Sequence, residues 1–88
     1  MARFIRFHPE AYAEYLVWRK NDLDIFDRIN QLILDISREP FKGIGKPEPL
    51  KGNYKGCWSR RITLEHRLIY RIDASDVIVI KCQGHYDD

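Results

Sequence analysis

Two stretches in the first half of the chain repeat apolar residues at helical spacing. The first follows Pro9, a residue well suited to the first turn of a helix, and contains Ala11, Tyr12, Tyr15, Leu16 and Trp18. The pair Asn21-Asp22 should end this helix and cap the next one. The second stripe is longer and consists of Leu23, Ile25, Phe26, Ile29, Leu32, Ile33 and Ile36. Pro40 should stop it, so the pattern predicts two consecutive helices.

The remaining segments have the alternating or continuous apolar pattern of strands. Arg3–Phe7 predicts a first strand, and three more are expected at roughly Cys57–Thr63, His66–Asp73 and Asp76–Gln83. Residues Phe41–Asn53 contain three glycines and two prolines, which predicts a loop. The expected fold is therefore α+β, in the order β-α-α-β-β-β. Two helices should pack on one face of an antiparallel sheet.

Residue parity predicts which strand side chains share a face, because successive side chains point to opposite faces. The even-numbered residues are mostly apolar and should pack on the helices: Trp58, Ile62, Leu68, Tyr70, Ile72, Ile78, Ile80 and Cys82. The odd-numbered residues define the opposite face, here called the basic face: Ser59, Arg61, Thr63, Arg67, Ile69, Arg71, Val79, Lys81, Gln83 and His85. Only Arg60 breaks the even pattern, and we expect it to reach solvent at the sheet edge.

Length and composition limit the class of protein. With 88 residues, 44% hydrophobic and 32% charged, the chain is expected to be a single soluble domain spanning residues 1–88. It has no apolar run long enough for a bilayer and no secretory leader before Phe4, so we expect a cytoplasmic protein that contacts no membrane. Cys57 and Cys82 are too few for a disulfide scaffold and should be reduced. The basic face also lacks a set of side chains with metal-ligand spacing.

Charge is divided between the two halves of a chain whose formal net charge is only +2. Residues 9–39 contain seven acidic and four basic side chains, whereas residues 51–71 contain six basic and one acidic. This division suggests that a polyanion contacts only the second half. A scatter of solvated surface charges would give the same counts.

The second half also contains the groups needed to cleave RNA. Glu48 lies between two prolines in a loop that leads into the basic strands, so it could reach over the basic face. A carboxylate and a histidine can move protons at a ribose 2′-hydroxyl and at the leaving 5′-oxygen, while arginine forks hold the phosphate. Each group also has an ordinary structural explanation. Glu48 could be a solvated charge, His85 an exposed bystander, and Tyr86 a core residue. His8 and His66 are given no role.

Several motifs together resemble a known family. They are KPEPL at 46–50, WSRRI at 58–62, EHRLIY at 65–70 and HY at 85–86. With them, nearly the whole chain resembles the YoeB-type toxins of the RelE superfamily, from bacterial type II toxin–antitoxin systems. The resemblance implies a RelE-like microbial RNase fold. It also implies a cytoplasmic endoribonuclease that enters the ribosomal A site, cuts messenger RNA there without a metal or other cofactor, and so inhibits translation.

The resemblance further implies roles for individual residues. Glu48 would be the general base, Arg67 would stabilise the phosphate and the transition state, and His85 would be the general acid. The residues expected to bind RNA are Lys51, Arg61 and Tyr86.

Partners also follow from the resemblance. They are a YefM-type antitoxin, the ribosome with its messenger, and a second copy of the chain in a homodimer. Operator DNA would be contacted only through the antitoxin complex. Family members commonly stop at the tyrosine, whereas here Asp87 and Asp88 follow Tyr86. The alternative is a catalytically silent module that binds the antitoxin, and a third possibility is an RNase that acts on naked RNA.

Overall fold

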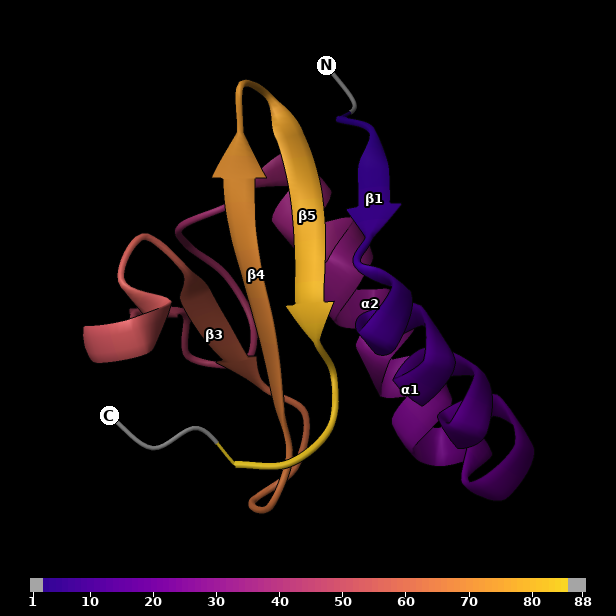
Figure 1. Cartoon of the computed structure of the whole chain (residues 1–88). Coiled ribbons are helices and arrows are strands. Elements are labelled where there is room, and N and C mark those ends of the chain that lie inside the picture. The colour runs from indigo at the N-terminus through magenta and orange to yellow at the C-terminus, as the bar shows by residue number, and fades with distance from the viewer. Residues whose placement is uncertain (1–2, 86–88) are drawn as a thin grey trace.

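The structure is a computed structural model that describes residues 3–85. Within them, two helices cover one face of a five-stranded sheet (Figure 1). The elements are β1 (Ile5–Phe7), α1 (Pro9–Asn21), α2 (Leu23–Arg38), β2 (Glu48–Pro49), the 3₁₀ helix η1 (Gly52–Tyr54), β3 (Trp58–Arg61), β4 (Arg67–Asp73) and β5 (Asp76–Lys81). The predicted α+β class and element order are confirmed. The segment predicted to be only loop also contains β2 and η1. Neither described helix is long and apolar enough to cross a membrane.

Polar side chains set the helix boundaries where the sequence predicts them. His8 caps α1, because its Nδ1 accepts a hydrogen bond from the Glu10 N–H at 3.3 Å. Asp22 ends α1 and caps α2, where its Oδ1 accepts from the N–H groups of Asp24 and Ile25 at 3.1 and 3.2 Å. These bonds satisfy backbone donors that the first turn of a helix leaves free.

The sheet is mixed, which corrects the expectation that it is purely antiparallel. Its strand order is β1-β5-β4-β3-β2, and β1 runs parallel to β5 while the other neighbours are antiparallel. Figure 1 shows β1 beside β5 at one edge, with α2 behind the sheet and α1 at the lower right, below β1 and in front of α2. Parallel neighbours need a long crossover connection. The two helices, together with β2, β3 and β4, lie between β1 and β5 in the chain.

The face prediction holds for β3, for β4 and for Lys81 and Cys82 at the end of the sheet, but it is wrong for Val77, Ile78 and Val79 of β5. The cross-strand pairs include Trp58–Tyr70, Ile69–Lys81 and Tyr70–Val79. The last pair joins an even residue to an odd one, so Ile80 is an extra residue that forms a β-bulge. Val77 and Val79 therefore belong to the core against the helices, and Val79 leaves the basic face. Ile78 pairs instead with Arg71, on the other side of the sheet.

The core lies between the helices and the sheet. Its buried members are Ala11, Ile29, Leu32, Ile33, Ile36, Ile62, Leu68, Tyr70, Val77, Val79 and Cys82. Leu23, the first residue of the predicted α2 stripe, is 62% exposed instead.

Both cysteines are free, as predicted. Burial, with a contribution from Glu14, raises the pKa of the Cys82 thiol to about 12, so this core thiol stays protonated and unreactive.

Arg60 is fully buried and does not reach solvent at the sheet edge as predicted. It forms an ion pair with Asp35 of α2, and its Nε donates to the Tyr70 hydroxyl at 3.3 Å. Its two terminal nitrogens also donate to backbone carbonyl oxygens, at 2.7 to 3.1 Å, of Glu39, Lys42 and Ile44. A buried guanidinium is tolerated only when its donors find acceptors. The chain after α2 supplies them by folding around the side chain, which fixes the start of the loop that leads to Glu48.

This buried ion pair should make the stability of the protein pH-dependent. Burial alone would raise the pKa of Asp35, but hydrogen bonds from Arg60 and from the Ile44 N–H, together with the positive charges of Arg60 and Arg38, outweigh it and lower that pKa. A lowered folded-state pKa adds stability above the usual aspartate range, and this stability is lost as the pH falls through the folded value. We expect Asp35→Asn to cost about 3 kcal/mol at pH 7, and clearly less in acid.

Urea unfolding of the wild type and of Asp35→Asn at pH 7 and at pH 3 would measure how the loss of stability depends on pH. Asp27→Asn is the matched control, because Asp27 is an exposed aspartate on the same helix. It should change the free energy of unfolding by less than about 0.5 kcal/mol at either pH. If Asp35→Asn lowers the free energy of unfolding equally at both pH values, the ion pair with Arg60 is not the source of the pH dependence.

Candidate active site

The short strand β2 brings Glu48 onto the basic face. Glu48 pairs with Ser59 of β3, Ser59 with Ile69 of β4, and Ile69 with Lys81 of β5. Cross-strand partners lie on the same face of a sheet. These four residues therefore form one row across the sheet, on the side away from the helices. Parity alone would have assigned the even-numbered Glu48 to the opposite face.

Backbone hydrogen bonds hold β2 against β3 on both sides of Glu48. The Arg61 N–H donates to the Gly45 carbonyl at 2.7 Å, and the Leu50 N–H donates to the Cys57 carbonyl at 2.9 Å. The flanking prolines restrict the backbone between these bonds, and proline is tolerated because β2 is an edge strand. Gly45 has φ +81°, which favours glycine, and a Cβ there would lie 2.8 Å from the Leu32 side chain. Glu48 is thus presented from a fixed backbone.

Arg61 and Arg67 are direct cross-strand partners on the basic face. Both are half-buried, and neither forms an ion pair with another of residues 3–85. The Nε atom of each is buried without a hydrogen-bond acceptor in that part of the chain. Two like charges directly opposite one another repel. An anion with several acceptor oxygens, such as a phosphodiester, would relieve this repulsion and satisfy the free donors.

The segment after β5 brings His85 next to Arg67. It turns back past the beginning of β4 (Figure 1), where the Gly84 carbonyl accepts a hydrogen bond from the Arg67 N–H at 3.0 Å. The Gly84 N–H donates to Nδ1 of His66 at 2.9 Å. His85 follows directly and is exposed. A carboxylate and two arginines therefore share one face of the sheet, and the segment that carries the histidine lies beside Arg67. The four residues come from four separate segments of the chain.

The other predicted site residues lie around this region or beyond the described chain. Lys51 is exposed between β2 and η1, three positions after Glu48. Tyr86 lies outside the described residues, as do Asp87 and Asp88. Lys81 shares the row of Glu48, although the sequence suggested no catalytic or RNA-binding role for it. It could have been found from its place on the basic face.

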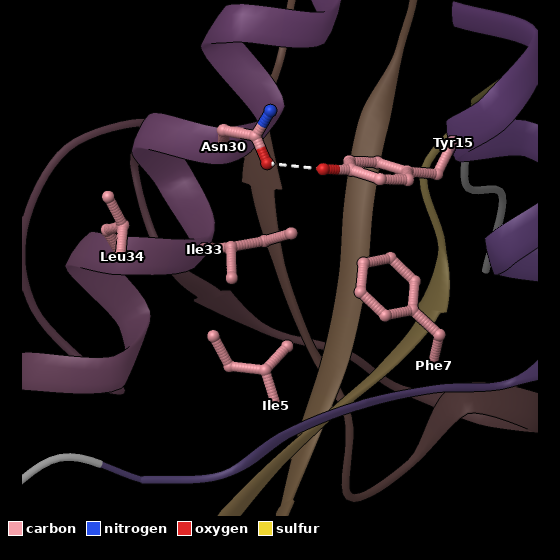
Figure 2. Close-up of a pocket in the computed structure, with 6 residues that line it drawn as sticks. All are labelled: Ile5, Phe7, Tyr15, Asn30, Ile33 and Leu34. Atoms are coloured by element: carbon pink, nitrogen blue, oxygen red, sulfur yellow. Dashed lines mark hydrogen bonds between the residues drawn. The ribbon is translucent and has the colours of Figure 1, made fainter. Parts of the chain in front are cut away.

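A pocket lies between β1, α1 and α2 (Figure 2). It has a volume of about 440 Å³ and is lined by Ile5, Phe7, Tyr15, Asn30, Ile33 and Leu34. The Tyr15 hydroxyl donates to the Asn30 side-chain oxygen at 2.7 Å, so these two polar groups satisfy each other. No carboxylate or imidazole lines this pocket, so it lacks the side chains that usually carry out acid–base chemistry. Among residues 3–85, no three His, Cys, Asp or Glu side chains gather as metal ligands.

Comparison with known proteins identifies the family. The family model described as a YoeB-like toxin of bacterial type II toxin–antitoxin systems matches residues 7–86. The chain belongs to this family of toxins. The curated Toxin YoeB of Synechocystis sp. is 51% identical to it over 82 residues, which are 93% of this chain and 95% of the relative.

Solved structures agree with this family assignment. A YoeB/ParE toxin from Agrobacterium tumefaciens superposes on the toxin with a TM-score of 0.91 at 44% identity, covering 94% of this chain and 99% of that one. A YoeB dimer from Staphylococcus aureus gives 0.90 at 40% identity, and a YoeB–YefM complex from the same organism gives 0.88 at 39%. Each covers 98% of this chain and 100% of the other. The resemblance inferred from the sequence motifs is thereby confirmed.

Proposed function

We propose that this toxin is a metal-independent endoribonuclease that cuts messenger RNA in the ribosomal A site and so stops translation. The observation that carries the proposal is the cross-strand pair Arg61–Arg67, whose Nε donors have no acceptor among residues 3–85. This pair lies on the same face as Glu48 and beside the segment that carries His85. A phosphodiester fits such a pair because each planar guanidinium can hydrogen-bond two of its oxygens.

The residues suggest a reaction in which the RNA supplies its own nucleophile. Glu48 accepts the proton of a ribose 2′-hydroxyl, and the oxygen attacks the adjacent phosphorus. Arg61 and Arg67 stabilise the charge that grows on the phosphate oxygens. The bond from phosphorus to the 5′-oxygen breaks while His85 donates a proton to that oxygen. The products are a 2′,3′-cyclic phosphate and a 5′-hydroxyl.

Further side chains would hold the RNA without taking part in the chemistry. Lys51 and Lys81 can contact neighbouring phosphates, and Tyr86 is assigned to RNA binding by the family resemblance. The basic face belongs to a small domain and has no separate substrate-binding module in the described residues. We therefore assign the positioning of the messenger to the ribosome.

The test is cleavage of a labelled messenger on programmed ribosomes, with the ends of the fragments identified by mass spectrometry. We expect cutting within the A-site codon, a 2′,3′-cyclic phosphate on the upstream fragment, and very slow cutting of the same RNA without ribosomes. Absence of cleavage would favour the catalytically silent antitoxin-binding module. Equal cleavage of naked RNA would favour a free-standing RNase.

We also propose that a YefM-type antitoxin binds the toxin and that the toxin forms a homodimer. The relatives from Staphylococcus aureus, a YoeB–YefM complex and a YoeB dimer, support both. Any contact with operator DNA would run through the antitoxin. Sedimentation of the isolated toxin at micromolar concentration should show the dimer, and a monomer at that concentration would contradict it.

Antitoxin association should depend strongly on salt. An acidic antitoxin segment over the basic face would be steered by charge, so raising the salt from 50 to 500 mM should lower the association rate by at least about tenfold. Stopped-flow measurement of that rate checks the expectation. A rate that does not change with salt would show that the contact is not electrostatic.

A further inference from the structure

The segment that carries His85 is held by two elements distant in sequence. At Cys82, the backbone N–H donates to the Glu14 carboxylate at 2.8 Å, and the backbone carbonyl accepts from the Trp18 indole N–H at 2.8 Å. Both side chains come from α1. At Gly84, the remaining bonds come from the beginning of β4. The part of the segment nearest to His85 therefore depends on β4 and not on the helix.

The bond to His66 is the only one of these four in which an imidazole is the acceptor. The Arg67 N–H donates to the Gly84 carbonyl, which is a bond between two backbone groups. The Gly84 N–H donates instead to a side-chain atom, Nδ1 of His66. The His66 ring also packs edge-on against the Trp18 ring, with centroids 4.8 Å apart. The backbone N–H of His66 donates a hydrogen bond to the Thr63 hydroxyl. This bond fixes the backbone from which the ring extends. The ring is thus oriented toward Gly84 from two sides.

The N–H donor of Gly84 determines the protonation state and the tautomer of the His66 imidazole. Because a backbone N–H can only donate, Nδ1 of His66 must carry no proton, and the neutral ring must carry its proton on Nε2. In the imidazolium both nitrogens are donors, so Nδ1–H and the Gly84 N–H would face each other and the bond would be lost.

We propose that His66 is a positioning residue for His85. In its neutral form it holds Gly84 against β4 and thereby keeps the following residue beside Arg67. The inference deepens the proposed function and rests on it only for the role of His85 as general acid. It gives a role to a histidine that the sequence left without one.

The proposal requires opposite charge states in two neighbouring histidines. His85 must be protonated to donate to the leaving oxygen, whereas His66 must be neutral to hold the segment. The charged or titratable groups next to His66 in the chain, or on the terminal segment and bonded to it, are Glu65, Arg67, Cys82, His85 and Glu14 of α1, whose carboxylate accepts from the Cys82 N–H. Adding a proton to His66, or removing the proton of His85, should therefore each lower the rate of cleavage.

Two substitutions separate the hydrogen bond from the bulk of the ring. His66→Asn places an amide oxygen at about the position of Nδ1 and accepts a hydrogen bond at any pH. His66→Leu keeps a side chain of similar size but accepts nothing. His8→Leu is the matched control, because it removes an equivalent bond, in which Nδ1 of His8 accepts from the Glu10 N–H at the beginning of α1.

The first measurement does not depend on activity. The protection factor of the Gly84 amide proton, which compares its exchange rate with that of an unstructured peptide at the same pH, is followed by NMR between pH 5 and pH 8 and reports the bond. We expect strong protection at pH 8 and loss of protection toward pH 5 in the wild type. Protection should persist throughout in His66→Asn, be absent throughout in His66→Leu, and match the wild type in His8→Leu. Equal protection of Gly84 in the wild type and His66→Leu would overturn the proposal.

The second measurement is single-turnover cleavage on ribosomes. His66→Leu should lower the rate at saturating toxin by about 10–100-fold with little change in the concentration needed for saturation. His66→Asn should restore most of the rate and remove the fall between pH 8 and pH 5 that His66 causes. Wild-type cleavage by His66→Leu would overturn the proposal. Absence of cleavage by the wild type would refute the proposed function instead, and amide exchange would still decide whether His66 holds the segment.

Discussion

A messenger with one 2′-deoxy nucleotide on the 5′ side of the scissile phosphate should remain uncut by the toxin on ribosomes. The side chains near the basic face that could attack phosphorus are poor nucleophiles. Ser59 is only 2% exposed, and burial raises the pKa of the Cys57 thiol although Arg71 opposes this. The attacking oxygen should therefore be the substrate's own 2′-hydroxyl, with Glu48 as its base. Removing that hydroxyl should reduce cleavage to background.

The position of the deoxy nucleotide supplies the control. Placing it one nucleotide further along in either direction should leave the rate nearly unchanged, because the nucleophile is then intact. Toxin binding to the programmed ribosome, measured by co-sedimentation, should be equal for all three messengers. Efficient cutting of the message that lacks the scissile hydroxyl would show that water or a protein group attacks. Glu48 would then need another role.

Arg67→Ala should lower single-turnover cleavage by about 10²–10⁴-fold while ribosome binding stays largely intact. The half-buried guanidinium of Arg67 would stabilise charge that appears only as the phosphorus is attacked, so its loss raises the barrier more than it weakens binding. Glu48→Gln and His85→Ala should lose activity on the same scale. Quench-flow measurement at saturating toxin gives the rate of the chemical step.

Arg71→Ala is the matched control for Arg67→Ala. Arg71 lies on the same strand but is exposed, and it already pairs with Asp73 at 4.0 Å. Its loss should change the rate less than about tenfold, as expected for a contact made equally with substrate and transition state. Arg67→Lys should recover only part of the lost rate, since an ammonium lacks the planar fork. If Arg67→Ala and Arg71→Ala lower the rate equally, Arg67 acts only through its positive charge and does not specifically stabilise the transition state.

Much of the architecture could be predicted because it depends on local signals. The apolar stripe of α2, the Asp22 cap and the stop at Pro40 all act within a few residues of where they stand, and the helix forms where they indicate. Residue parity also predicts the faces of β3 and β4 correctly, because side chains alternate regularly in a strand without a bulge. It places Arg61 and Arg67 on the same face, where they are cross-strand partners.

The features that could not be predicted depend on contacts between distant segments. The bulge at Ile80 reverses the alternation in β5, and its position depends on the pairing with β4. Arg60 looked like an interruption of the core because its acceptors come from a loop some twenty residues earlier in the chain. His66 had no visible role, since its partner Gly84 reaches it only through the turn after β5. Glu48 joined the basic face by pairing with Ser59, which parity cannot anticipate.

The pairing of β1 with β5 determines when the molecule can become complete during synthesis. Ile5 pairs with Val77, so the first strand made must wait for the last one before it gains its partner. Contacts this far apart in sequence form slowly, because nearly the whole chain must be ordered to close them. The segment bearing His85 emerges later still. A nascent chain therefore contains Glu48, Arg61 and Arg67 before it contains the strand that completes the sheet and the histidine that completes the proposed site.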